Sequence, residues 1–216
     1  MEILKKIHRE IIALSPEDSF IVEDRTKEYF DYPIHYHPEM ELNFVLNGKN
    51  VRRIVGDSME KIDDIDLVLL GPNLYHVWEQ HECGNKKIRE VTIQFHRDLF
   101  DDALLHRSVM RPIKEMFDRS AHGILFSRET SIALKDRILK VSKMGGMDNF
   151  MELFSILYDL SISRKQRLLS TLGIQPINFE SSNRIKALHD FVQKNYSKKI
   201  TLTEAADLVN MSNVSF

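Results

Sequence analysis

The arrangement of hydrophobic and polar residues changes twice along the chain and divides it into three regions. Residues 20–96 contain short apolar or alternating runs separated by turn residues, as is typical of β-strands. From residue 98 to residue 170, apolar residues recur every three to four positions, a spacing that predicts helices. Residues 184–216 return to helical spacing. The pattern therefore predicts an α+β protein whose strands come first and whose helices follow.

Turn residues separate the strands expected in the first region. Asn47–Gly48 is a strong signal for a tight hairpin between its flanking strands. Gly56–Asp57 and Gly71–Pro72–Asn73 predict two further turns. Many short strands with frequent turns indicate a sandwich or a barrel. The expected strands are residues 42–46, 51–55, 66–70, 76–78 and 88–96.

Two helices are predicted in the second region. Gly145–Gly146 lies between their apolar stripes, so the helices should fold back on each other as an antiparallel hairpin. This hairpin is a natural dimer surface, although packing within one chain would produce the same stripes. The stripes are Ile132, Ile138, Leu139 and Val141 in the first helix, and Phe150, Met151, Phe154, Leu157 and Tyr158 in the second.

The third region ends in a pattern typical of a helix-turn-helix. Thr201 and Glu204 have the spacing of a capping box, which marks a helix start. Asn210 can end that helix because asparagine tolerates a left-handed backbone, and Ser212 can cap a new helix. A helix, a tight turn and a second helix form the unit that places the second helix in the major groove of DNA. The apolar face of the first helix is Leu202, Ala205, Ala206 and Val209.

Composition narrows the class of protein. A formal charge of −2 excludes a uniformly basic nucleic-acid binder, so any DNA contact must be local. Cys83 is the only cysteine, which excludes an intrachain disulfide and favours a reducing compartment. The first residues do not resemble a signal peptide, and no apolar run is long enough to span a membrane. We therefore expect a cytoplasmic protein without membrane contact.

Candidate chemistry is concentrated in the strand region. His35, His37 and Glu41 have the same parity, so one regular strand would direct all three side chains to one face. His76 follows a later turn and can join them from a neighbouring strand. Imidazoles and a carboxylate that converge in this way can hold a divalent transition metal such as Zn, Ni, Fe or Mn. The alternative is that these histidines only line a pocket or pack in the wall of the barrel.

Two further residues are candidates for contact with a small ligand. Asn43 is in phase with Glu41 and offers a hydrogen-bond donor. Trp78 has the parity of His76 and is either a core residue or a stacking surface for a sugar. The mixture of residue types suits a sugar or another small polar metabolite. The candidate ligand-binding residues are His35, His37, Glu41, Asn43, His76 and Trp78, and no catalytic residue is assigned.

These motifs resemble known families. The His-x-His motif, the following Glu and the later His resemble the cupin pattern, in which such residues bind metal inside a small β-barrel. Residues 66–76, 93–100 and 200–212 resemble, in turn, the sensor strand, the strand-to-helix junction and the first helix-turn-helix of AraC-family transcriptional regulators. The last segment is the most specific of the three.

The AraC resemblance implies an architecture and a function. The expected segments are a cupin-like sensor barrel (double-stranded β-helix or jelly roll; 1–97), a helical connector and dimerisation region (98–170), a linker (171–183) and a partial all-α helix-turn-helix domain (184–216). A small-molecule effector in the barrel would control how a homodimer binds operator DNA. The resemblance places Asn213, Val214 and Ser215 at the start of the recognition helix. Because family members carry two such units, the chain is expected to be truncated and to bind DNA poorly by itself.

Two other classes of protein remain open. A metal-dependent cupin enzyme, such as a dioxygenase or an isomerase, would use the same metal ligands, and a fold does not decide function. A ligand-binding module without a DNA role is the third class. The capping box and the turn that follows it favour the regulator over both alternatives.

Overall fold

The computed structural model describes residues 8–15, 17–84, 87–171, 191, 195, 198, 200–209 and 211–213. The chain forms two compact units, Met1–Ile174 and Gln175–Phe216. The first unit contains the strands and most of the described helices, which confirms the α+β class. Residues 98–170, expected to form a separate connector, belong to the same unit as residues 1–97.

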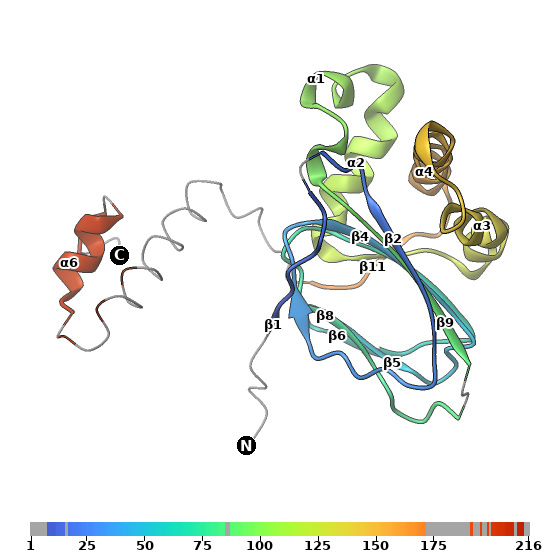
Figure 1. Ribbon diagram of the computed structural model, residues 1–216, viewed down its shortest axis with the longest axis horizontal. Coiled ribbons are helices and arrows are strands. Elements are labelled where there is room, and N and C mark those ends of the chain that lie inside the picture. The colour runs from blue at the N-terminus through green and yellow to red at the C-terminus, as the bar shows by residue number, and fades with distance from the viewer. Residues whose placement is uncertain are drawn as a thin grey trace. The chain divides into compact units, whose positions relative to one another are not determined.

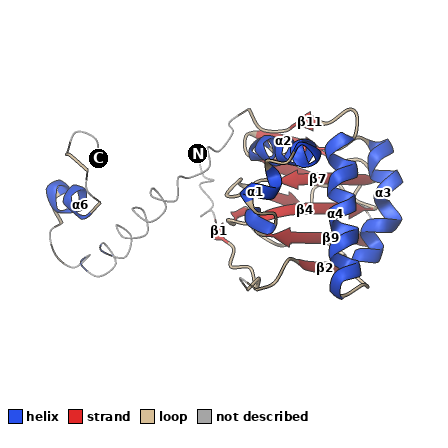
Figure 2. Cartoon of the chain, turned by 90° about the horizontal axis from the view of Figure 1, so that it is seen from above, coloured by secondary structure: helices blue, strands red, loops and turns tan. Residues whose placement is uncertain are grey.

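The first unit has three layers: two sheets and a set of helices that covers one sheet (Figure 1; Figure 2). The smaller sheet has the strand order β1-β3-β8-β5-β6, and the larger sheet has the order β11-β10-β7-β4-β9-β2. The strands of the smaller sheet are β1 (His8–Arg9), β3 (His35–Tyr36), β8 (His76–Glu79), β5 (Arg52–Val55) and β6 (Ser58–Lys61). Those of the larger sheet are β11 (Arg167–Leu168), β10 (Ile124–Leu125), β7 (Ile65–Leu70), β4 (Met40–Leu46), β9 (Ile88–Phe95) and β2 (Ile21–Lys27).

The helices lie over the outer face of the larger sheet (Figure 2). The turn predicted at Gly145–Gly146 is confirmed, since one helix ends at Val141, the next begins at Gly146, and the two pack together. Gly146 has a φ of 63°, a conformation that suits glycine. The helices of this unit are α1 (Asp102–Leu105), α2 (Arg111–Arg119), α3 (Arg128–Val141) and α4 (Gly146–Ile162), with 3₁₀ turns at Arg97–Leu99, Ser108–Met110 and Ser120–His122.

Successive side chains along the strands of the larger sheet alternate between its two faces. One face packs against the helices, and the other faces the smaller sheet. Leu42 and Phe44 belong to the core that the sheet shares with the helices. Val45 belongs to the second core, which also contains residues of the smaller sheet. Because successive side chains of a strand point to opposite faces, Glu41 and Asn43 share the face of Val45 and lie between the two sheets. The parity of β4 therefore places its polar residues in the interior, where they need partners.

The hairpin predicted at Asn47–Gly48 is wrong. Strand β4 pairs with β7 and β9, whereas β5 pairs with β6 and β8, so this segment carries the chain from one sheet to the other. Gly48 donates its N–H to the carbonyl of Asp64 at 3.2 Å rather than closing a two-residue turn. The left-handed conformation that the dipeptide favours does occur, at Asn47 with a φ of 59°. By contrast, the turn at Gly56–Asp57 does close a hairpin, between β5 and β6.

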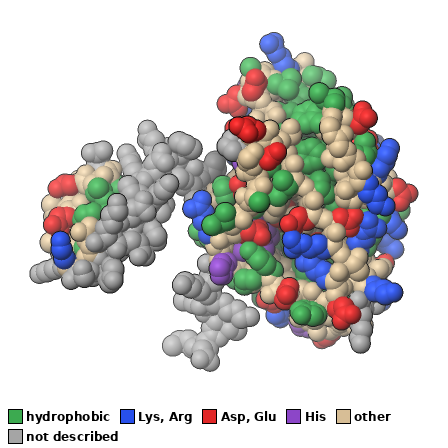
Figure 3. Space-filling model, in the orientation of Figure 1, with side chains coloured by type: hydrophobic (Ala, Val, Ile, Leu, Met, Phe, Trp, Pro, Cys, Tyr) green, Lys and Arg blue, Asp and Glu red, His purple; other side chains and the backbone are tan. Residues whose placement is uncertain are grey.

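Charges of both signs are interspersed on one face of this unit (Figure 3). That distribution agrees with the small net charge of the chain. Within the described part of the chain, no helix is both long and apolar enough to cross a membrane.

Candidate functional site

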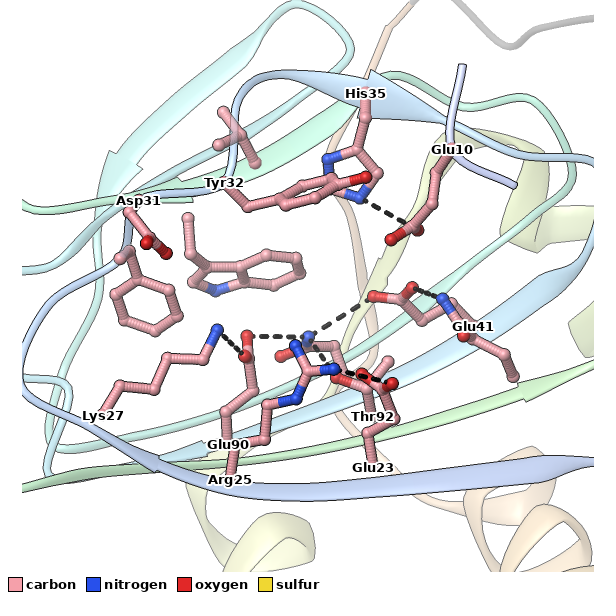
Figure 4. Close-up of a pocket in the computed structure, with 15 residues that line it drawn as sticks. Glu10, Glu23, Arg25, Lys27, Asp31, Tyr32, His35, Glu41, Glu90 and Thr92 are labelled. Carbon is pink, nitrogen blue, oxygen red and sulfur yellow. Dashed lines mark hydrogen bonds and ion pairs between the residues drawn. The ribbon is translucent and has the colours of Figure 1, made fainter. Parts of the chain in front are cut away.

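A cavity of about 100 Å³ lies between the two sheets (Figure 4). Its wall includes residues of β3 and β8 from the smaller sheet and of β2, β4 and β9 from the larger one. Four of the six predicted ligand-binding residues line it: His35, Glu41, Asn43 and Trp78. The other two, His37 and His76, are buried beside it and do not form its wall.

His35 and His76 are brought together by strand pairing. They are directly opposite each other in the β3–β8 ladder, and their ring centroids are 4.2 Å apart. His35 donates its Nδ1–H to the carbonyl of Pro33 at 2.9 Å, and His76 donates its Nδ1–H to the carbonyl of Leu74 at 2.8 Å. A carbonyl can only accept, so these bonds fix the tautomer and leave Nε2 of each ring free for a ligand.

His37 and Glu41 lie close to His35 and His76, but they do not belong to one continuous strand as predicted. The strand is not continuous: β3 ends at Tyr36, Pro38 follows His37, and β4 starts at Met40. The parity argument for one regular strand is therefore wrong. His37 lies in the segment that crosses between the sheets, and its Nε2 is 3.0 Å from a carboxylate oxygen of Glu41. The residues converge because the two sheets face each other.

The cluster has the geometry that a metal site needs. One nitrogen from each of His35, His37 and His76 lies within 4.8 Å of the others. Glu41 is close as well, with a carboxylate oxygen 3.8 Å from Nε2 of His76. Buried Nδ1 of His37 and Nε2 of His76 have no hydrogen-bond partner among the described residues. Buried polar atoms are normally satisfied, so the unpartnered Nε2 of His76 fits a divalent transition metal held by three imidazoles and a carboxylate, whereas Nδ1 of His37 lies 3.6 Å from Glu39.

Glu10 is a member of the site that the sequence pattern did not reveal. It forms a second group with His37 and Glu41, again with one ligand atom from each within 4.8 Å. A carboxylate oxygen of Glu10 lies 3.6 Å from Nε2 of His35. The residue follows β1, which pairs in parallel with β3. No spacing motif links residues so distant in sequence, and only the strand pairing brings Glu10 to the cavity.

Burial and mutual contact set the protonation states of the cluster. Burial, with help from the neighbouring His76, lowers the pKa of His35 to about 4, so this ring is neutral at pH 7. Burial alone would lower the pKa of His37, but its hydrogen bond to Glu41 raises it. The pKa of Glu41 is well below its usual value, since the nearby histidines outweigh burial. Burial and the charge of Glu41 raise the pKa of Glu10.

Trp78 connects the cavity with a buried ion pair. Its side chain is 4% exposed, and its indole N–H donates to Asp66 at 3.3 Å. Asp66 in turn pairs with Arg53 at 2.5 Å, and Arg53 also bonds Glu60 at 2.8 Å. The tryptophan is therefore fixed by a hydrogen bond on one edge while its ring contributes to the cavity wall.

The C-terminal unit contains the predicted helix start. Helix α6 (Leu202–Leu208) begins with a capping box: Thr201 accepts from the N–H of Glu204 at 3.2 Å, and Glu204 accepts from the N–H of Thr201 at 2.8 Å. Ala205, Ala206 and Val209 are buried as expected, whereas Leu202, which was predicted to lie on the same apolar face, is 56% exposed.

After α6 the chain turns back on itself. Met211 donates its N–H to the carbonyl of Ala206 at 2.9 Å, and the side chain of Asn213 donates to Thr203 at 3.0 Å. Of the three predicted DNA-binding residues, Asn213 is exposed. Val214 and Ser215 lie outside the described residues, as does Asn210.

Comparison with known proteins yields a remote structural similarity. No protein-family model and no curated protein matches the chain. Among solved structures, ToxT from Vibrio cholerae O395 aligns with a TM-score of 0.43 and 10% identity, covering 91% of this chain and 71% of that chain. ToxT bound to an unsaturated fatty acid aligns at 0.40 and 9%, covering 90% and 70%. An apo ToxT variant aligns at 0.44 and 10%, covering 91% and 72%.

ToxT is a regulator of the AraC family, the family that the motifs of this chain resemble. Identities of 9–10% and TM-scores of 0.40–0.44 describe a distant likeness. We therefore base the functional assignment on the residues of this chain.

Proposed function

We propose that this chain belongs to a ligand-responsive, sequence-specific DNA-binding transcriptional regulator of the AraC type. One observation supports it above the others: a cavity with convergent polar side chains and a capped helix followed by a tight turn occur in separate units of one chain. A binding cavity alone suits an enzyme or a binding module equally well. A metal-dependent cupin enzyme would have no use for the second unit.

The cavity between the sheets is the proposed effector site. Ring faces and hydrogen-bonding groups line it together, as in sites for small polar ligands such as sugars. In this proposal His35, Glu41, Asn43 and Trp78 contact the effector directly. His37 and His76, which are buried beside the cavity wall, would influence the effector indirectly.

We propose His35, His37, His76 and Glu41 as the ligands of a divalent transition metal, Zn, Ni, Fe or Mn. The backbone carbonyls that accept from His35 and His76 would orient both rings and direct Nε2 of each toward the ion. When bound, the ion would supply a Lewis-acidic positive centre at one end of the cavity.

The outer face of the helix pair is the proposed homodimer surface. Met147 and Met151 on α4 are 71% and 52% exposed, and Tyr158 and Ile162 continue the same stripe. Ile132 on α3 is 53% exposed. Apolar side chains spaced in this way on one helix face are typical of helix–helix contact between subunits.

In the second unit, Asn213, Val214 and Ser215 are the proposed groove-facing residues. A regulator of this kind works in the cytoplasm on operator DNA, with two DNA-binding units placed on successive half-sites. Phosphate contacts would supply most of the affinity, so binding should weaken steeply with salt.

Selection from random duplex DNA tests the regulator assignment. The natural protein that contains these residues, expressed with whatever sequence its gene encodes after Phe216, is expected to enrich one motif at two positions about one helical turn apart. An Asn213→Ala variant should weaken enrichment, and Glu82→Gln, an exposed substitution in the first unit, should not. Recovery of unrelated sequences in every round would contradict the assignment.

A further inference from the structure

One buried atom of a residue in the cavity wall indicates the kind of ligand that the cavity can bind. The side-chain amide of Asn43 is 3% exposed, and its Nδ2 group faces three acceptors: Glu41 at 3.3 Å, Glu90 at 3.2 Å and Thr92 at 3.4 Å. Rotating the amide by half a turn would direct its oxygen at two carboxylates, so this orientation is fixed. Its Oδ1 is buried and has no partner among the described residues. A buried free acceptor requires a hydrogen-bond donor.

Charge around the cavity points to the same conclusion. The wall carries the carboxylates of Glu10, Glu23, Asp31, Glu41 and Glu90 but only two cationic side chains, Arg25 and Lys27. Arg25 is paired with Glu23 at 2.7 Å, and Lys27 is paired with Glu90 at 2.5 Å. Neither Glu10 nor Asp31 has a lysine or arginine partner within the residues that the structure describes.

Aromatic rings line the cavity together with these carboxylates. Trp78 and Phe30 are almost fully buried, and Tyr32 stands beside His35 (Figure 4). Aromatic faces attract cations, and the structure already contains one such contact, with Nζ of Lys27 4.9 Å from the centroid of the Phe30 ring. Carboxylates and aromatic rings in one wall provide two independent attractions for a positive group.

From these observations we propose that the effector is a small organic cation carrying an ammonium group. Its N–H groups would bond Oδ1 of Asn43 and the carboxylate of Glu10, while its carbon body would lie against Trp78. A cavity of about 100 Å³ suits a compact amine rather than a long chain. The inference rests on the proposed role of the cavity as the effector site and specifies the chemistry of the effector.

The proposed ammonium site adjoins the proposed metal site, because His35 and Glu41 line the cavity as well. His37 and His76 do not line the cavity. In Figure 4, His35, Glu10 and Glu41 lie toward one end, and Asp31 and Lys27 lie toward the other. An amine held by Asn43 and Glu10 would therefore lie beside the histidine cluster, and its binding can be measured in chelator-treated protein.

Ligands matched in shape and different in charge test the inference. Cyclohexylammonium, cyclohexanol and cyclohexanecarboxylate share one hydrocarbon ring. The corresponding ammonium, alcohol and carboxylate compounds with a propyl or a benzyl group provide two further matched sets. In chelator-treated protein, we expect at least one amine to raise the melting temperature in a concentration-dependent way. The alcohol and the carboxylate with the same hydrocarbon group should change the melting temperature little. Equal or larger stabilisation by the alcohols or carboxylates, or no stabilisation by any amine, would overturn the proposal.

Two isosteric substitutions locate the effect. Glu10→Gln removes one carboxylate charge from the wall and should weaken amine binding about tenfold, the usual loss for a hydrogen bond to a charged group. Glu82→Gln removes an acid that is 62% exposed and does not line the cavity, and it should leave amine affinity unchanged. The same affinity in wild type and Glu10→Gln would also overturn the proposal. Amine binding together with a failed DNA selection would instead contradict the regulator assignment and leave the effector chemistry supported.

Discussion

Replacing Arg53 by methionine is expected to lower the free energy of unfolding by about 3–5 kcal/mol, the usual cost of removing one partner from a buried ion pair. The side chain of Arg53 is 2% exposed and that of Asp66 is 5% exposed. Without the guanidinium, the buried carboxylate of Asp66 would retain the hydrogen bond from the indole N–H of Trp78 at 3.3 Å. Urea titration at pH 7 measures the effect.

Two comparisons separate this effect from general loss of a cation. The double variant Arg53→Met/Asp66→Leu should recover much of the lost stability because neither charge remains buried. Lys61→Met breaks the exposed Lys61–Glu82 pair and should cost less than about 1 kcal/mol. A similar loss in Arg53→Met and Lys61→Met would contradict the expectation.

The same pair predicts a pH dependence. Burial raises the pKa of Asp66 above its usual value, and Arg53 opposes this shift. Removing Arg53 should raise that pKa further, so the folded variant would hold a proton that the unfolded chain releases. The deficit in stability is then largest above the raised pKa and shrinks as the pH falls toward the ordinary value of 3.8. Urea titrations at pH 7 and pH 5 should show a smaller deficit at pH 5.

Zinc is expected to stabilise the first unit strongly. At a free concentration one hundred times its dissociation constant, a ligand that binds only the folded state raises the free energy of unfolding by about 2.7 kcal/mol. His76→Ala should remove most of this gain because it deletes one of the three imidazoles that lie within 4.8 Å of one another. Thermal unfolding of both proteins, each with zinc and with chelator, provides the measurement.

His81→Ala is the matched control for the zinc experiment. His81 pairs with Glu82 at 3.8 Å and does not belong to the histidine cluster. Its replacement should leave the zinc-dependent gain intact. If His76→Ala lowers the melting temperature equally in zinc-loaded and chelator-treated protein, the metal site is excluded.

Much of the fold could be predicted from local sequence pattern. The five predicted strands occur as β4, β5, β7, β8 and β9, with ends that differ by a residue or two. Alternation in β4 correctly put Glu41 and Asn43 on one face, because a strand fixes parity without reference to the rest of the chain. The capping box at Thr201 is likewise a local feature, complete within four residues.

Strand pairing could not be predicted in this way. Asn47 adopts the left-handed conformation that the turn signal implied, yet the chain leaves the turn for the other sheet. Nothing local distinguishes a hairpin from such a crossing, since the choice depends on which sheet the apolar side chains of β5 can complete. Pro38 interrupts the strand in the same way, so His35 and Glu41 meet across two sheets rather than along one strand.

The residues of the candidate site also fall into two groups: those that local sequence pattern predicts and those that only the tertiary structure brings together. The histidines and Glu41 were recognisable because the residue types and spacing suggest metal binding. Glu10 was not, because β1 is two residues long and its pairing with β3 is set by tertiary structure. The ion pair between Arg53 and Asp66 was also hidden, since both residues occur within runs that otherwise predict ordinary strands.

The most direct test of the proposed function is the affinity of the protein for the selected duplex. It is measured at constant salt, with and without an amine that raises the melting temperature of the protein. Coupling between an effector site and a distant site usually changes affinity by about 5- to 150-fold. We expect a change in that range in wild type and a much smaller one in Glu10→Gln. A ligand that occupies the cavity at saturation and leaves the dissociation constant for DNA unchanged would contradict the role of the cavity as a sensor.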